Sequence, residues 1–269
     1  MTSINTNAGA ILAQKFLRST TADMQVTQNR VSSGLRVATV TDDASSFAVA
    51  AGIRGDIKAY TAVAAALQGS TVAISVAISA GEMVAKRIGD LKAKTIQLFD
   101  TSLSSASRAS YIVDARSIAS EISSYLDQHA KYNGRNLIGV GGSDMTVVSA
   151  IDGSALVVRD NEIFGLDPDD FEPENHVQAE ASLGILANFK RQVDGALANL
   201  GSDLNRVKAQ IEFVKQTEET VRIGLGALVD ADLAKESATL TALQVRQQLG
   251  VQAIGIANSA PQTLLGLFR

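Results

Sequence analysis

Apolar residues recur at alternating steps of four and three along two long stretches of the chain. From Val63 to Leu98, this spacing places Val, Ile or Leu at most positions of one stripe. A second stretch repeats every seven residues, at Leu186, Val193, Leu200, Val207, Val214 and Val221. A period of 3.5 residues keeps apolar side chains on one seam of an α-helix. With a shorter run over residues 111–129, these stretches predict three helices that bundle and hide their seams within one chain.

The pattern changes in the middle of the chain. Residues 145–158 contain two β-rich runs around Asp152-Gly153, a dipeptide that suits a tight hairpin turn. The acidic stretch 167–175 that follows has the composition of a solvated surface loop. The predicted fold is therefore mainly α: a long antiparallel helical coiled-coil bundle with a small β-hairpin region in the middle of the chain.

The two ends of the chain differ from the predicted bundle. Ala10, Leu17, Met24 and Val31 form one thin seam near the N-terminus, whereas the C-terminal run is apolar on more than one face. Between residues 238 and 268 only Arg246 is charged. A helix that is apolar all round must be buried on all sides. We therefore predict that both ends are disordered in a lone molecule and fold when many copies pack together; protected amides there in the monomer would contradict this.

These patterns predict a division of the chain into two parts. Residues 1–40 and 226–269 form the terminal helices, and residues 41–225 form a helical rod domain with a small acidic excursion at about 140–180. Residues 141–180 carry ten acidic side chains against Arg159 alone, so this segment has a net charge of −9 and the rest of the chain sums to +5. No cluster of Lys and Arg of the kind that binds nucleic acid is present in the sequence.

Composition excludes several other functions. The chain has no Cys, which excludes disulfides, thiolate catalysis and Cys-ligated zinc. The N-terminal residues lack the basic region and cleavage pattern of a secretory signal peptide. Residues 59–81 are uncharged and long enough to span a bilayer, but Thr, Gln, Ser and Gly interrupt them. We therefore predict no membrane insertion.

Few residues are candidates for chemistry. Asp42 and Asp43 form an acidic pair that suits a cation or the cap of a following helix, and the cap is favoured. His129 lies on an apolar helical stripe and is expected to be a structural core residue, far in sequence from His176. No Ser has a plausible His-Asp partner. We predict no catalytic, cofactor-binding or metal-binding residues, and no enzyme.

Three motifs, in order along the chain, resemble a known family. Residues 3–7 (SINTN) and 31–50 (VSSGLRVATVTDDASSFAVA) resemble the N-terminal signature of bacterial flagellins, and residues 132–138 (YNGRNLI) resemble the motif that closes their N-terminal half. Residues 230–269, which end in Leu-Phe-Arg, resemble the flagellin C-terminus almost throughout. The compact size is most similar to short flagellins of the alphaproteobacterial kind.

The resemblance implies a function. A flagellin is a hairpin-shaped subunit that leaves the cell unfolded through the flagellar type III export channel and polymerises under a cap into the extracellular filament. It implies as partners other flagellin subunits, an export chaperone, the filament cap and the hook-associated junction proteins. The interface with subunits and chaperone is predicted at Leu17, Met24, Val31, Leu233, Leu240, Leu243, Leu249, Ile254, Leu264, Leu265 and Phe268.

Two alternatives stay open at this point. A hook–filament junction protein shares the terminal helices but occurs in few copies, and a coiled-coil signalling or adaptor module would need only the heptads of residues 63–98 and 186–221. One departure from the family concerns residues 84–97, which align with a stretch that an innate immune receptor reads. Arg87 and Leu91 match that stretch, but Gly89 stands where an arginine is expected.

Overall fold

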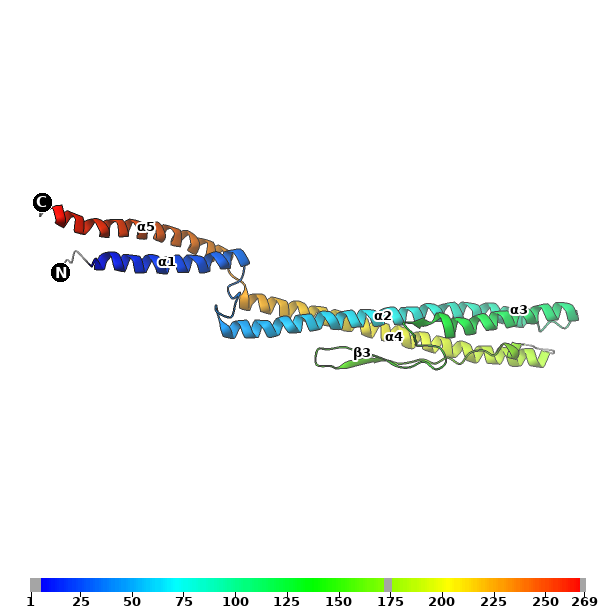
Figure 1. Ribbon diagram of the computed structural model, residues 1–269. Helices are drawn as coiled ribbons and strands as arrows, with labels where there is room; N and C mark the ends of the chain where they lie inside the picture. The colour runs from blue at the N-terminus through cyan, green and yellow to red at the C-terminus, as the bar shows by residue number, and fades with distance from the viewer. Residues whose placement is uncertain (1–5, 172–175, 267–269) are drawn as a thin grey trace. The chain divides into compact units, whose positions relative to one another are not determined.

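The computed structural model of the chain describes residues 6–171 and 176–266 (Figure 1). These residues contain five long helices: α1 (Ala8–Ser33), α2 (Ala44–Gln97), α3 (Ser105–Ser124), α4 (His176–Val229) and α5 (Leu233–Gly266). Between α3 and α4 lie the π-helix η1 (Tyr125–His129), the strands β1 (Lys131–Tyr132), β2 (Arg135–Asn136), β3 (Met145–Val148) and β4 (Ala155–Val158), and the 3₁₀ turn η2 (Pro168–Phe171). The predicted fold class, mainly α with a small β region in the middle, is confirmed.

The chain divides into two compact units. Met1–Gly55 and Thr220–Arg269 make up the first, here called the terminal unit, and Asp56–Glu219 make up the second, here called the bundle unit. Helices α2 and α4 each contribute residues to both units. Each unit contains its own cluster of buried apolar side chains.

The heptad seams predicted from the sequence form the core of the bundle unit. The buried side chains on α2 and α4 include Leu67, Ile74, Val84, Leu91, Leu186, Val193, Leu200, Val207 and Val214. The two helices pack closely at Gly81, where a Cβ atom would lie only 2.8 Å from the Cδ2 atom of Leu197. Glycine at this seam position therefore makes room for the leucine on the facing helix.

The third predicted stripe is wrong at its end. It was expected to continue through Tyr125 to His129; Tyr125 is half-buried against the core, but His129 is exposed, and Leu126 and Ala130 are buried. Leu126 follows buried Ile122 at an ordinary helical step of four. Because a π-turn contains one residue more than an α-turn, Ala130 rather than His129 is the next buried residue after η1. His129 is therefore not a core residue; its ring centroid lies 5.3 Å from that of Tyr125 on the surface.

The hairpin predicted at residues 145–158 is present, with a different turn. Strands β3 and β4 pair antiparallel from Met145↔Val158 to Val148↔Ala155. The last paired residues are Val148 and Ala155, so residues 149–154 connect the strands and the loop is longer than the predicted tight turn; among them only Gly153 has a positive φ, of 87°. A second hairpin, β1–β2, has the two-residue turn instead, with φ of 50° at Asn133 and 78° at Gly134. The Asn-Gly pair is a strong signal for such a turn, which the sequence analysis missed.

Part of the acidic stretch packs against the bundle. It was expected to be a solvated loop, but η2 buries the side chain of Phe171 completely. Asp169 also forms an ion pair of 2.6 Å with Arg116 of α3. The prediction is wrong at Phe171, which anchors the stretch, whereas Asp167, Asp169 and Asp170 are exposed as expected; residues 172–175 lie outside the described part of the chain.

Candidate functional site

Helices α1 and α5 of the terminal unit lie side by side and antiparallel (Figure 1). At one end, the Nδ2 atom of Asn7 donates to the backbone oxygen of Ala257 at 2.6 Å. At the other end, Arg30 and Glu236 form an ion pair of 3.4 Å. These two contacts set the register of the pair across most of its length.

Local sequence signals define where the two helices begin and end. The side chain of Asn7 caps α1 by accepting a hydrogen bond from the backbone N–H of Ala10. Gly34 ends α1 in a left-handed conformation with φ of 72°. Asp232 caps α5, because its Oδ1 atom accepts from the backbone N–H groups of Ala234 and Lys235. Both helices are thus delimited by residues with strong capping preferences.

The segments next to the paired helices are hydrogen-bonded to each other. The backbone oxygen of Val229 accepts from the N–H groups of Arg36 and Val37, and Ala231 donates to Gly34 at 2.9 Å. Leu35 and Asp230 form an antiparallel bridge. A small apolar cluster with Val37, Ala50 and Val229 at its centre lies beside them. The chain entering the helix pair and the chain leaving it are therefore held together.

The acidic pair before α2 has two structural roles. Asp43 caps α2, because it accepts from the backbone N–H groups of Ser45 and Ser46 and from the Ser46 hydroxyl. These bonds, first that of the Ser46 hydroxyl, lower the pKa of Asp43. Asp42 instead closes the preceding loop by accepting from Ala38 and Thr39, and the backbone hydrogen bond of Thr39 is the main cause of its lowered pKa.

The seam between α1 and α5 uses small residues at points of close approach. A Cβ atom on Gly250 would lie 3.3 Å from the Cδ1 atom of Leu17, and one on Gly9 would lie 3.9 Å from the Cβ of Ala257. Along these two helices the described side chains that are fully buried are Thr27 and Leu243. The helices therefore approach closely without enclosing a core of large apolar side chains.

The residues predicted as the interface separate into two sets. Leu243 is buried in the pair, and the half-buried side chains beside the seam are Leu17, Met24, Val31, Leu240 and Ile254. Leu233 and Leu249 are exposed. Leu264 and Leu265 lie in the last turns of α5, where only the backbone is described, and Phe268 lies outside the described residues.

Both helices also carry large apolar side chains on their outer faces. On α1 these are Ile11, Leu12, Phe16 and Val26, and on α5 they are Leu233, Val245, Leu249, Val251 and Ile256. Phe16 is 64% exposed and Ile256 is 72% exposed. The set on α1 was not predicted, although Leu12 and Phe16 are four residues apart and so share a face. A surface with this many exposed apolar side chains favours association with another apolar surface.

The polar side chains of the site have structural roles. Among residues 6–171 and 176–266, no group of three or more His, Asp or Glu side chains lies together as a metal site requires. The ionisable side chains described above cap helices or form ion pairs. The geometry of the helix pair supports association through apolar contact.

Comparisons with known proteins agree on one family. Residues 4–139 match the bacterial flagellin N-terminal helical region, and residues 179–268 match the bacterial flagellin C-terminal helical region. The chain is 34% identical to a flagellin of Brucella melitensis over the full length of both chains. It is 33% identical to flagellin FljN of Caulobacter vibrioides, covering 100% of this chain and 99% of that one.

A solved structure shows the same fold. The putative flagellar hook-associated protein from Vibrio parahaemolyticus has a TM-score of 0.61 and 15% sequence identity, with 70% of this chain and 100% of that chain covered. At this identity the similarity concerns the fold alone.

Proposed function

The chain belongs to the bacterial flagellin family and is a structural subunit of the flagellar filament, and we propose that α1 and α5 form the surface through which it polymerises. The observation that carries this proposal is the outer face of the helix pair. Large apolar side chains are exposed on both helices, such as Phe16 on α1 and Ile256 on α5. Soluble monomeric proteins rarely expose large apolar patches, and such a patch is typical of a surface that binds another protein. In a polymer, neighbouring copies remove these side chains from water.

We further propose that residues 1–40 and 226–269 form the core of the filament, with residues 41–225 outside it. The paired helices and the hydrogen-bonded segments at 34–37 and 229–231 lie within the proposed core region. Its interface would then be Leu17, Met24, Val31, Leu240, Leu243 and Ile254 for pairing within a subunit, and Leu233 and Leu249 for contact between subunits.

The remaining expectations from the family belong to the same proposal. The chain is a component of an extracellular filament, and we propose that it is secreted unfolded through the flagellar export channel. An export chaperone would cover the apolar faces of α5 before assembly, and the cap and junction proteins would contact subunits at the ends of the filament. We also propose that the subunit has no enzymatic activity, since it belongs to a family of structural proteins.

The hook–filament junction protein is the nearest alternative within the same system. The full-length similarity to proteins named flagellin favours the filament subunit. The amount of the chain in sheared filaments distinguishes the two, because a junction protein is present in few copies. A stable dimer in solution would instead favour the signalling coiled coil.

The polymerisation surface is tested by adding one charge to the outer face of α5. We expect Ile256→Asp to abolish filament formation, because an unpaired carboxylate at a buried contact costs several kcal/mol and every copy repeats the defect. Asn258→Asp adds the same charge two residues along, at an exposed polar position, and is the matched control. Sedimentation and electron microscopy of seeded polymerisation give the measurement. Normal filaments from Ile256→Asp would rule out this face as the assembly surface.

A further inference from the structure

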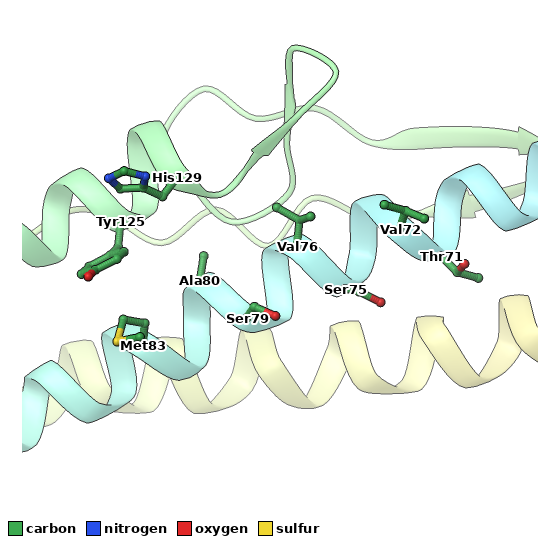
Figure 2. A pocket seen from close by; sticks show the side chains of 9 residues that line it. All are labelled: Thr71, Val72, Ser75, Val76, Ser79, Ala80, Met83, Tyr125 and His129. Carbon is green, nitrogen blue, oxygen red and sulfur yellow. The ribbon is translucent and has the colours of Figure 1, made fainter.

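Two of the cavities in the bundle unit differ in the chemistry of their lining. One is a groove of about 500 Å³ between α2 and η1, where Figure 2 shows Tyr125 of η1 pointing toward Ala80 and Met83 of α2. Its lining is mostly apolar and contains no Lys, Arg, Asp or Glu. The other, here called the polar pocket, has a volume of about 310 Å³ and lies between α4 and the segment that follows β4. Its lining residues are all polar: Arg159, Asn161, Asn199, Ser202, Asp203 and Arg206.

The segment that follows β4 directs its one arginine into the polar pocket and the neighbouring acid away from it. Residues 141–180 carry ten acidic side chains and a single basic one, Arg159. Arg159 and Asn161 line the pocket. Asp160, between them, lies against the opposite loop, because a Cβ atom on Gly142 would be only 2.5 Å from its Oδ1 atom. This alternation is that of extended chain. The most acidic part of the protein thus contributes a positive charge to the pocket.

Hydrogen bonds fix the amide groups of the polar pocket. The Nδ2 atom of Asn199 donates to Oδ1 of Asn161 at 2.8 Å, and Nδ2 of Asn161 donates to the backbone oxygen of Arg159 at 3.0 Å. The second N–H of the Asn199 amide and the hydroxyl of Ser202 have no acceptor within the described part of the chain. Asn199 and Ser202 are three residues apart on α4 and so share a face. Both are therefore donors available to a ligand in the pocket.

The two guanidinium groups of the polar pocket differ in their partners. Arg206 is paired, since its Nη2 atom donates to Oδ1 of Asp203 at 2.9 Å and also to the backbone oxygen of Val157. The guanidinium of Arg159 has no carboxylate or carbonyl acceptor among residues 6–171 and 176–266. With Arg159, Arg206 and Asp203 charged, the pocket has a net charge of +1. A guanidinium presents a planar fork of N–H donors that matches a carboxylate or a phosphate.

We propose that the polar pocket binds a small oxyanion, a molecule with one carboxylate or phosphate group, and that Arg159 pairs with that group. Asn199 and Ser202 donate to the same group or to an oxygen beside it, and Asp203 holds Arg206 in place. The volume lies at the lower end of the range of about 300–1,000 Å³ for small-molecule sites, so the ligand is small. The site is separate from α1 and α5, and its occupation does not depend on polymerisation.

Titration of the monomer tests whether the pocket is a binding site. The probes are sodium phosphate and sodium acetate, each added while sodium chloride keeps the ionic strength constant. We expect the NMR signals of the Asn199 side-chain amide and of the backbone at residues 199–206 to shift and to saturate, with a dissociation constant of about 1–10 mM for at least one probe. Saturation by phosphate alone or by acetate alone identifies the preferred group. Shifts that grow linearly with both probes, without saturation, would overturn the proposal.

Removal of one charge tests the role of Arg159. Arg159→Gln is expected to raise the dissociation constant of the saturating probe at least about tenfold, because the guanidinium that pairs with the anion is lost. Arg191→Gln removes the same charge from an exposed position of α4 outside the pocket and is the matched control. Thermal unfolding without the probe should be the same for both variants. Equal dissociation constants for the two variants would mean that the pocket is not the site.

A conservative substitution separates the fork of Arg159 from its charge. Arg159→Lys keeps the positive charge but replaces the planar fork by a single ammonium group. We expect its dissociation constant to lie between those of the original chain and of Arg159→Gln. The rise in unfolding temperature caused by the probe should follow the same order, since a ligand that binds the folded chain stabilises it. Binding by Arg159→Lys as tight as that of the original chain would contradict paired recognition by the guanidinium, while leaving the filament function untouched.

Discussion

The bundle unit and the helix pair α1–α5 use similar apolar patterns in opposite ways. In the bundle unit, large side chains such as Leu67, Leu91 and Leu200 are completely buried, and glycine appears where a facing leucine needs room. In the pair, small residues lie at the points of closest approach, and large side chains such as Phe16 and Ile256 are exposed. The bundle therefore stabilises itself, whereas the pair needs other molecules to bury its apolar surface.

This difference supports the proposal that the ends of the chain form the polymerisation surface. In the bundle most large side chains of the seams are buried within the molecule, whereas in the pair Leu243 is the large side chain of the described residues that is buried. The pair keeps the two helices together through contacts at Gly250 and Leu17 and through the ion pair of Arg30 and Glu236. Its outer faces remain available, and we infer that they become buried in the filament.

The largest expected effect on stability comes from the bundle core. Leu200→Ala should lower the free energy of unfolding by about 2–5 kcal/mol, because the side chain is fully buried and its removal leaves a cavity. Leu249→Ala, at a position 57% exposed, should change it by less than about 0.5 kcal/mol. Denaturant unfolding of the monomer, followed by circular dichroism, measures both.

The effects of these two substitutions on polymerisation should have the reverse order of size. At low temperature Leu200→Ala is expected to form filaments, since its outer surface is unchanged, while Leu249→Ala should raise the critical concentration. If Leu249→Ala polymerised normally and Leu200→Ala did not, the distinction between a self-sufficient bundle and a partner-dependent pair would be wrong.

A smaller effect is expected at the seam of the helix pair. Gly250→Val should destabilise the pairing of α1 with α5 by about 1–3 kcal/mol, because the added methyl groups meet Leu17. Gly255→Val is the control for helix propensity, since a Cβ atom there has no neighbour within 4 Å. The temperature at which filaments dissociate reports the difference. The same loss in both variants would show that the close approach at Gly250 is unimportant.

The smallest effect concerns the cap of α2. The pKa of Asp43 is lowered in the folded state, so its carboxylate stabilises the fold above the unfolded pKa of about 3.9 and loses this contribution as the pH falls through the folded value. Asp43→Asn keeps a side-chain oxygen as acceptor but cannot ionise. The difference in unfolding free energy between the original chain and this variant should therefore shrink below about pH 4. A difference that stays constant down to pH 2 would argue against the assigned role.

Most of the helical architecture was predictable because it depends on periodic patterns. The heptads of residues 63–98 and 186–221 specify which face of each helix is buried, and Asp152-Gly153 marks the β3–β4 hairpin, although its loop is longer than predicted. Of the N-terminal seam, Leu17, Met24 and Val31 are half-buried, whereas on α5 Leu243 is buried and Leu233 is exposed. Such patterns act locally, within a few turns of helix.

The features that were missed depend on contacts that no local pattern specifies. The π-turn at Tyr125–His129 moves His129 out of the core, and Phe171 turns an acidic loop into part of the packed bundle. The sequence also does not show which leucines of α5 pack against α1 and which remain exposed. That depends on the register of the pair, in which Leu243 is buried and Leu249 is exposed.

By itself, the sequence determined that this chain is a helical filament subunit with apolar ends, because periodicity and family motifs are both local properties of the residues. Only the tertiary structure decided how each apolar side chain is used. The packing of α1 against α5 leaves Phe16 and Ile256 exposed, and at η1 Leu126 is buried whereas His129 is exposed. Both depend on how two segments distant in sequence pack against each other.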